Sequence, residues 1–210
     1  MIKRNNLAAM VTLLKRTYPR AHCSLDHRTP FQLLAATILS AQCTDERVNM
    51  VTPGLFMKYP GPAEMAAAPI KDLEALVRST GFYKNKALSL KEASKALMAG
   101  FGGLVPRTME ELLTLRGVAR KTANVVLGSA YGIAAGVVVD THVKRLALRM
   151  GLTRQTDPVK VELDIMKALP KKDWIWFAHA VVTHGRAVCN ARNPLCGNCP
   201  LNKLCPKKGL

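Results

Sequence analysis

Four of the chain's six cysteines lie close together near the C-terminus, in the pattern C-x6-C-x2-C-x5-C. Only one pair in this pattern has the C-x2-C spacing that is typical of a structural zinc site. A glycine and three prolines within and just after the pattern favour a loop around a group bulkier than one ion. We therefore expect a [4Fe–4S] cluster, with one zinc ion or two disulfides as the alternatives. The expected ligands are Cys189, Cys196, Cys199 and Cys205.

The charge of the chain points to a polyanionic partner. Its 31 lysines and arginines outnumber 14 acidic residues, giving a formal net charge of +17, as expected for a protein that binds nucleic acid or an acidic membrane. The longest mostly apolar run, residues 125–139, is interrupted by glycines and is too short to span a bilayer. The N-terminus lacks a signal-peptide cleavage site and predicts an amphipathic helix. We expect a cytoplasmic protein without a membrane partner, in which thiols stay reduced and disulfides are disfavoured.

Helix signals recur along the chain, whereas strand signals are almost absent. Thr29–Pro30 and Asp157–Pro158 each combine an N-cap residue with a first-turn proline. Thr108 and Glu111 have the spacing of a capping box. Only the valines at 137–139 suggest a strand, and three residues do not make a sheet. The predicted fold class is all-α.

Residues 111–130, E-L-L-T-L-R-G-V-A-R-K-T-A-N-V-V-L-G-S-A, predict a helix-hairpin-helix. The chain turns at Gly117, and a second helix starts near Arg120. Such a turn can present backbone N–H groups to a DNA phosphate. Lys121 lies in the first turn of the second helix, where the helix dipole disfavours the ammonium form. If the site is also partly desolvated, the neutral amine becomes a nucleophile; the alternative is a solvated surface lysine.

Asp140 closes an apolar run and precedes a second amphipathic segment, T-H-V-K-R-L-A-L-R. A carboxylate there is expected to be an N-cap, worth about 1 kcal/mol. That role is compatible with catalysis, because a capped carboxylate stays anionic and fixed in place. Cys23 and Cys43 lie far from the cysteine cluster in sequence, and we interpret them as small packing residues.

Several motifs together resemble the endonuclease III family of DNA glycosylases. They are S-A-Q-C-T-D, G-F-Y-K-N-K-A, R-K-T-A-N-V-V-L, V-D-T-H-V-K-R, H-G-R-A-V-C and the cysteine loop, which occur in the family's order and spacing from about Phe31 to Cys205. The resemblance implies a two-lobed fold with the active site in the cleft between the lobes. A six-helix barrel with the hairpin would span residues 22–133, and a discontinuous cluster domain would comprise residues 1–21 and 134–210.

The resemblance also implies roles for individual residues. Lys121 matches the catalytic lysine and Asp140 the catalytic aspartate. Gln42 matches the residue that fills the gap left by a flipped nucleotide, and Phe82 falls where the family places an apolar wedge. Alternatives for these two are a helix-end polar residue and a core aromatic. Arg192, on the cluster loop, is expected to meet a phosphate.

The implied function is excision of damaged bases from duplex DNA by a protein with a [4Fe–4S] cluster. The sequence gives no sign of an oligomer, and we expect a monomer. The related adenine glycosylases lack a lysine at the position of Lys121, so its presence implies a bifunctional glycosylase and abasic-site lyase acting on oxidised pyrimidines such as thymine glycol. The alternatives are a monofunctional glycosylase, a non-catalytic iron–sulfur protein that binds DNA, and a structural zinc protein.

The hairpin departs from the family pattern Leu-Pro-Gly-Val-Gly at two positions, Arg116 and Ala119. A methyl group at 119 stands where backbone approaches phosphate or where positive φ is needed, which predicts a weaker contact. Arg116 can compensate with a phosphate contact of its own. The cluster loop is also less basic than is usual, with Asn193 and Leu195 at positions where the family often has lysine or arginine. We expect altered DNA affinity or lesion preference with a normal catalytic step.

Overall fold

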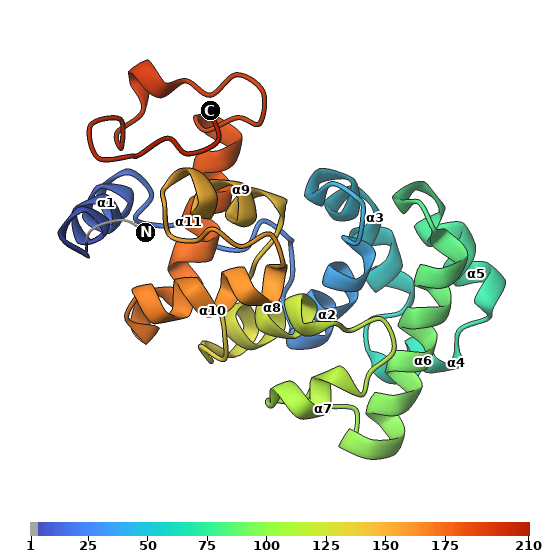
Figure 1. Cartoon of the computed structure of the whole chain (residues 1–210). Coiled ribbons are helices and arrows are strands. Elements are labelled where there is room, and N and C mark those ends of the chain that lie inside the picture. The colour runs from blue at the N-terminus through green and yellow to red at the C-terminus, as the bar shows by residue number, and fades with distance from the viewer. Residues whose placement is uncertain (1–3) are drawn as a thin grey trace. The chain divides into compact units, whose positions relative to one another are not determined.

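The structure is a computed structural model that describes residues 4–210. Within this range all regular secondary structure is helical (Figure 1). The all-α prediction is thereby confirmed, and the valines at 137–139 form no strand. No helix among the described residues has the length and apolar character needed to cross a membrane.

The chain divides into two compact units. The central unit is Cys23–Ile133, and the terminal unit joins the N-terminal segment through His22 to Ala134–Leu210. The helices of the central unit are α2 (Pro30–Leu39), α3 (Asp45–Lys58), α4 (Pro62–Ala67), α5 (Ile70–Val77), η1 (Arg78–Thr80), α6 (Tyr83–Phe101), α7 (Met109–Leu113) and α8 (Arg120–Tyr131). Those of the terminal unit are α1 (Arg4–Thr17), α9 (Thr141–Arg149), α10 (Pro158–Ala168), η2 (Lys171–Asp173), α11 (Trp174–Ala187) and η3 (Cys196–Asn198).

In the central unit, α2 is the most deeply buried helix. Thr29 caps it by accepting a hydrogen bond from the backbone N–H of Gln32, and Pro30 begins its first turn, as predicted. Every residue from Leu33 to Leu39 is buried, so α2 is covered on all sides. It packs against α8, α3 and α6, while α4 and α5 pack along α6. The hairpin helix α8 is thus anchored to the core of this unit.

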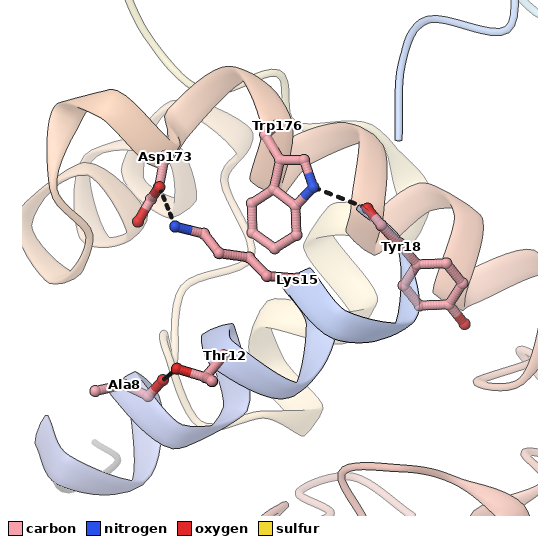
Figure 2. Close-up of polar contacts among 6 residues, drawn as sticks. All are labelled: Ala8, Thr12, Lys15, Tyr18, Asp173 and Trp176. Atoms are coloured by element: carbon pink, nitrogen blue, oxygen red, sulfur yellow. Dashed lines mark hydrogen bonds and ion pairs between the residues drawn. The ribbon is translucent and has the colours of Figure 1, made fainter. Parts of the chain in front are cut away.

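In the terminal unit, the N-terminal segment forms the amphipathic helix that its sequence predicts. Leu7, Met10, Val11 and Leu14 recur at helical spacing and are buried in the core of this unit. Two polar contacts then fix the end of α1 beside η2 and α11 (Figure 2). Nζ of Lys15 lies 2.6 Å from Oδ1 of Asp173, and Nε1 of Trp176 donates to the carbonyl oxygen of Tyr18 at 2.9 Å.

The remaining predicted caps are also present, with one difference. Asp157 accepts from the N–H of Lys160 at the start of α10. Thr108 accepts from the N–H of Glu111 at the start of α7. The carboxylate of Glu111, however, accepts from the Thr108 hydroxyl rather than from its backbone N–H. The capping box is therefore half formed, because the two side chains bond to each other.

Candidate active site and iron–sulfur centre

The predicted hairpin consists of α7, the turn at residues 114–119, and α8. Leu112, Leu115 and Val118 are buried and hold the turn on the central unit. The turn is closed by the N–H of Val118, which donates to the carbonyl of Leu115 at 3.1 Å. Between these anchors, Arg116 and Gly117 are exposed, as is Ala119. The residues that were predicted to meet DNA therefore stand on the solvent side of the turn.

Gly117 is required at the turn for two independent reasons. Its φ of +81° lies in the region that favours glycine. In addition, a Cβ at this position would lie 2.8 Å from Cβ of Ser89 on α6. Any side chain would therefore be strained and would also collide with the neighbouring helix.

Ala119 is the N-cap residue of α8, with φ −99° and ψ 171°. This extended conformation is open to any residue. Of the two alternatives for position 119, the need for positive φ is therefore wrong for this chain, and the methyl group of Ala119 causes no backbone strain. The replacement of glycine by Ala119 can therefore affect DNA binding only through the exposed methyl group.

Lys121 is exposed in the first turn of α8. The first four backbone N–H groups of a helix have no partner within it, and the helix dipole places partial positive charge at that end. An anion that approaches the hairpin therefore meets the start of α8, the turn that carries Lys121.

Asp140 is the N-cap residue of α9 in the terminal unit. Its Oδ1 accepts a hydrogen bond from the N–H of Val143 at 2.7 Å, which confirms the predicted cap. Val137 and Val139, just before it, are buried and fix the approach of the chain. One oxygen of the carboxylate thus holds the helix, and the side chain remains half-buried.

Two side chains that interact electrostatically with Asp140, those of His179 and Arg145, were not identified as site residues from the sequence. The pKa of His179 is lowered to about 4, by burial first and then by His22, while the charge of Asp140 opposes the shift. The pKa of Arg145 is lowered by burial and by Arg149, and raised by Cys189 and Asp140. In the sequence, only the i, i+4 spacing of Arg145 and Arg149 on α9 indicates that their side chains lie close enough to interact.

Gln42 and Phe82 share an unusual backbone conformation. Among residues 4–210, the non-glycine residues with positive φ are Gln42, Phe82 and Lys207. Gln42 is exposed in the turn after α2, with φ 51°. Phe82 caps α6 with φ 49°, and 67% of its surface is exposed. The alternative that Phe82 is a core aromatic is therefore excluded.

The four clustered cysteines line one pocket in the terminal unit. Its wall combines their thiols with apolar side chains, including Leu146, Val188 and Leu201. Among residues 4–210, no three His, Cys, Asp or Glu side chains converge closely enough to hold a single metal ion. No disulfide joins any of the six cysteines. Four sulfurs around an apolar pocket fit the ligand set of a [4Fe–4S] cluster.

Polar contacts, two of them from residues outside the loop, hold these cysteines in place. Arg145 donates through Nη2 to the carbonyl of Cys189 at 2.9 Å. The N–H of Leu201 lies 3.4 Å from Sγ of Cys199, and Nε2 of His184 lies 3.5 Å from the same sulfur. Donors directed at ligand sulfurs are typical of iron–sulfur sites, where they tune the cluster. The residues present therefore fit the cluster.

Other sequence predictions fall outside this pocket. Cys23 and Cys43 belong to the central unit and do not line it. Arg192 is exposed on the loop between the first two ligands, and Asn193 and Leu195 are exposed beside it, although Leu195 also lines the pocket. The loop thus presents one arginine to solvent between Cys189 and Cys196.

Comparisons with known proteins agree with this geometry. The profile of the "HhH-GPD superfamily base excision DNA repair protein" family matches residues 35–171. The "iron-sulfur binding domain of endonuclease III" matches residues 189–205, the span from the first to the last clustered cysteine.

Individual relatives match over nearly the whole chain. Endonuclease III of Synechocystis sp. is 56% identical over 97% of this chain and 93% of its own length. Endonuclease III of Bacillus subtilis is 45% identical over 92% of this chain and 91% of its own. A solved structure of a trapped endonuclease III–DNA covalent intermediate has a TM-score of 0.93 at 42% identity, covering 99% of this chain and 97% of that one. The chain therefore belongs to the endonuclease III family, as a DNA glycosylase of base excision repair that carries a [4Fe–4S] cluster.

Proposed function

We propose that this glycosylase is bifunctional: it excises oxidised pyrimidines of the thymine glycol type from duplex DNA and then cleaves the strand at the abasic site. The observation that carries this proposal is the position of Lys121, an exposed amine in the first turn of α8, directly after the hairpin. A lysine beside a phosphate-binding helix terminus can serve as a nucleophile toward the sugar. The covalent intermediate trapped for a 42% identical structure supports the same route.

Two groups of residues are proposed to hold the DNA. The hairpin binds a phosphate through backbone N–H groups around Gly117 and Ala119, assisted by Arg116, and Arg192 binds another from the cluster loop. None of these contacts reads a base, so they position the duplex. Gln42 and Phe82 enter the base stack, where Gln42 replaces the extruded nucleotide and Phe82 wedges beside the opposite strand.

The reaction begins with extrusion of the damaged nucleotide, which costs a few kcal/mol and less for a lesion that stacks poorly. The lone pair of Lys121 Nζ attacks C1′, and the electrons of the glycosidic bond leave with the base, which takes up a proton. The sugar ring then opens to a protonated imine between Nζ and C1′. Asp140 stabilises the positive charge that develops at the sugar and helps to deprotonate Lys121.

Strand cleavage follows from the imine. Its positive charge makes a C2′ proton acidic, and loss of that proton allows the C3′–O bond to break with departure of the 3′ phosphate. This β-elimination cuts the strand 3′ to the lesion, and hydrolysis of the imine frees Lys121.

The cluster has a structural role in this proposal. Four cysteine thiolates would complete the coordination of its irons and leave no open position for a substrate. The cluster would therefore serve as a rigid support for the loop that carries Arg192. Cysteines that form no disulfide and a DNA substrate are both consistent with action in the cytoplasm, bound to the nucleoid. We propose that the enzyme acts there as a monomer, which light scattering of the DNA-free protein would test.

The proposed chemistry is tested by borohydride trapping on two duplexes, one with thymine glycol and one with an abasic site. Borohydride reduces the imine to an amine and leaves a covalent protein–DNA adduct. The parent protein should form the adduct on both duplexes, and Lys121→Ala should form it on neither. Lys84→Ala is the matched control, because Lys84 is likewise exposed at the second position of its helix, α6.

Loss of trapping in Lys121→Ala alone would establish the Schiff base. Trapping on the abasic duplex but not on thymine glycol would retain the lyase and remove the proposed lesion class. If the parent releases thymine glycol without trapping or strand cleavage, the enzyme is monofunctional and the lyase proposal fails.

A further inference from the structure

The turn that carries Phe82 is strained and exposed. Gly81 has φ 71° and ψ 155°, and Phe82 follows with φ 49° and ψ 29°. A bulky residue rarely adopts this left-handed conformation, and it persists only where surrounding structure holds it. Phe82 itself is mostly exposed, so its side chain makes few contacts that could do so. The restraint has to act on the backbone of the turn.

Lys86 provides this restraint at two points. Its Nζ donates to the carbonyl oxygen of Thr80 at 2.7 Å. Its backbone N–H donates to the carbonyl oxygen of Phe82 at 3.1 Å. The two accepting carbonyls flank Gly81. The backbone bond is the ordinary i to i−4 bond at the start of α6, so the side-chain bond to Thr80 is the contact that is specific to Lys86. Thr80 is itself buried, and its hydroxyl donates to the carbonyl of Val77 at 2.7 Å.

The side chain of Lys86 is buried, and its amine makes a specific hydrogen bond. Only 5% of its surface is exposed. Burial lowers the pKa of Lys86, and the nearby Cys43 thiol raises it. Placing an amine in such surroundings is unfavourable unless it makes a specific hydrogen bond. Cys43 follows Gln42 directly, so Lys86 lies near the turn of Gln42 as well as the turn of Phe82, and both of these exposed residues have positive φ.

We propose that Lys86 is a positioning residue that holds the turn at residues 80–82 so that Phe82 is presented to the duplex without reorganisation. This inference rests on the proposed role of Phe82 in the base stack. Fixing the wedge before DNA binds avoids the cost of ordering an exposed turn during nucleotide extrusion. Lys86 itself does not need to touch DNA.

The test compares two reactions of the same protein, which carries its cluster. One is single-turnover base release from a duplex with thymine glycol, which requires extrusion from a paired stack. The other is cleavage of a single-stranded abasic oligonucleotide, which has no opposite strand for Phe82 to meet. Lys86→Met should slow the first about tenfold and leave the second within about twofold of the parent.

Lys91→Met is the matched control. Lys91 is also on α6 and also donates to a backbone carbonyl, that of Ala68, but it does not contact the turn at Phe82. It should leave both reactions unchanged. If Lys86→Met does not fold, Lys86→Gln withdraws the donor from Thr80 with a shorter polar side chain and is measured in the same way.

A double-mutant cycle identifies the residue through which Lys86 acts. In the Phe82→Ala background, Lys86→Met should have little further effect on base release, because the wedge is already gone. An undiminished effect in that background would overturn the inference, as would an equal loss in both reactions. If the parent releases no base at all, the proposed function has failed, and that result is distinct from a failure of Lys86.

Discussion

Nη1 of Arg149 lies 3.3 Å from Sγ of Cys189, so the last residue of α9 contacts the first cysteine of the cluster loop. The same guanidinium donates to the carbonyls of Asn190 and Ala191 at 2.7 and 2.8 Å. Sγ of Cys205, the last of the four cysteines, lies 3.4 Å from the backbone oxygen of Arg149. Arg149 thus contacts both ends of the loop, and only 6% of its surface is exposed.

Replacing Arg149 with methionine should weaken cluster retention. The variant keeps most of the apolar volume but leaves two carbonyls and one ligand sulfur without their donor, which we expect to destabilise the loop by about 3 kcal/mol. The visible absorbance of the cluster should decay faster than in the parent during incubation with a chelator. Arg154→Met, a change at an exposed arginine just beyond α9, should decay like the parent. Equal decay of all three proteins would contradict the prediction.

Gly117→Ala should destabilise the central unit more than an ordinary glycine replacement does. The new Cβ meets Ser89 at 2.8 Å and also occupies a φ of +81°. Gly132→Ala is the matched control, because Gly132 has φ 67° but no atom within 4 Å of its Cβ position. We expect the free energy of unfolding to fall by about 3 kcal/mol in Gly117→Ala and by about 1 kcal/mol in Gly132→Ala, as measured by thermal unfolding. Equal losses would mean that Ser89 moves aside freely.

Arg116 and Ala119 should change DNA affinity in distinguishable ways. Arg116→Gln removes an exposed charge from the hairpin turn, so the slope of log affinity against log salt should fall by about 0.9. Ala119→Gly removes only a methyl group and relieves no backbone strain, because φ is already −99°. It should raise affinity by the same factor at every salt concentration and leave the slope unchanged. Identical affinities for Ala119→Gly and the parent across the series would remove the methyl group as a determinant of binding.

The sequence predicts those features that depend on local chemistry. Thr29 and Asp157 reveal helix starts because an N-cap satisfies backbone groups within three residues of itself. The spacing of the four cysteines predicts a shared pocket because the loop between them is short. Backbone conformations set by distant contacts cannot be read in this way. The positive φ of Phe82 depends on how its turn is held, and the extended backbone at Ala119 removes positive φ as one of the two reasons for a weaker contact there.

The same limit applies to buried charges. Lys86 and Arg149 look like ordinary surface residues of amphipathic helices in a chain with 31 basic residues. Their burial follows from tertiary packing, which places a backbone carbonyl or a cysteine sulfur within reach of each side chain. Sequence periodicity records neither partner. The contacts from Arg149 to the cluster loop join residues about forty positions apart, and the Thr80 carbonyl that accepts from Lys86 lies before the start of α6.

His179 should make the stability of the protein depend on pH on the acid side of neutrality. Its pKa is lowered to about 4 in the folded state, mainly by burial and further by His22, whereas an unfolded histidine titrates near 6.5. Above about pH 6.5 it is neutral in both states and contributes no pH dependence. As the pH falls from there toward about 4, the unfolded state binds a proton that the folded state does not, so stability falls by about 1.4 kcal/mol per pH unit.

His179→Gln should therefore lose less stability than the parent between about pH 7 and about pH 5.5, by about 1 kcal/mol in thermal unfolding. The pKa of His184 is also lowered by burial, but His184 is present in both proteins, so its contribution cancels in the comparison. Asp140 opposes the shift of His179, so Asp140→Asn should lower the pKa of His179 further and extend the acid loss to lower pH, because the positive form of His179 then lacks its nearby carboxylate. If the parent and His179→Gln lose stability in parallel, His179 is protonated in the folded protein as readily as in the unfolded chain, and its buried surroundings do not exclude the charge.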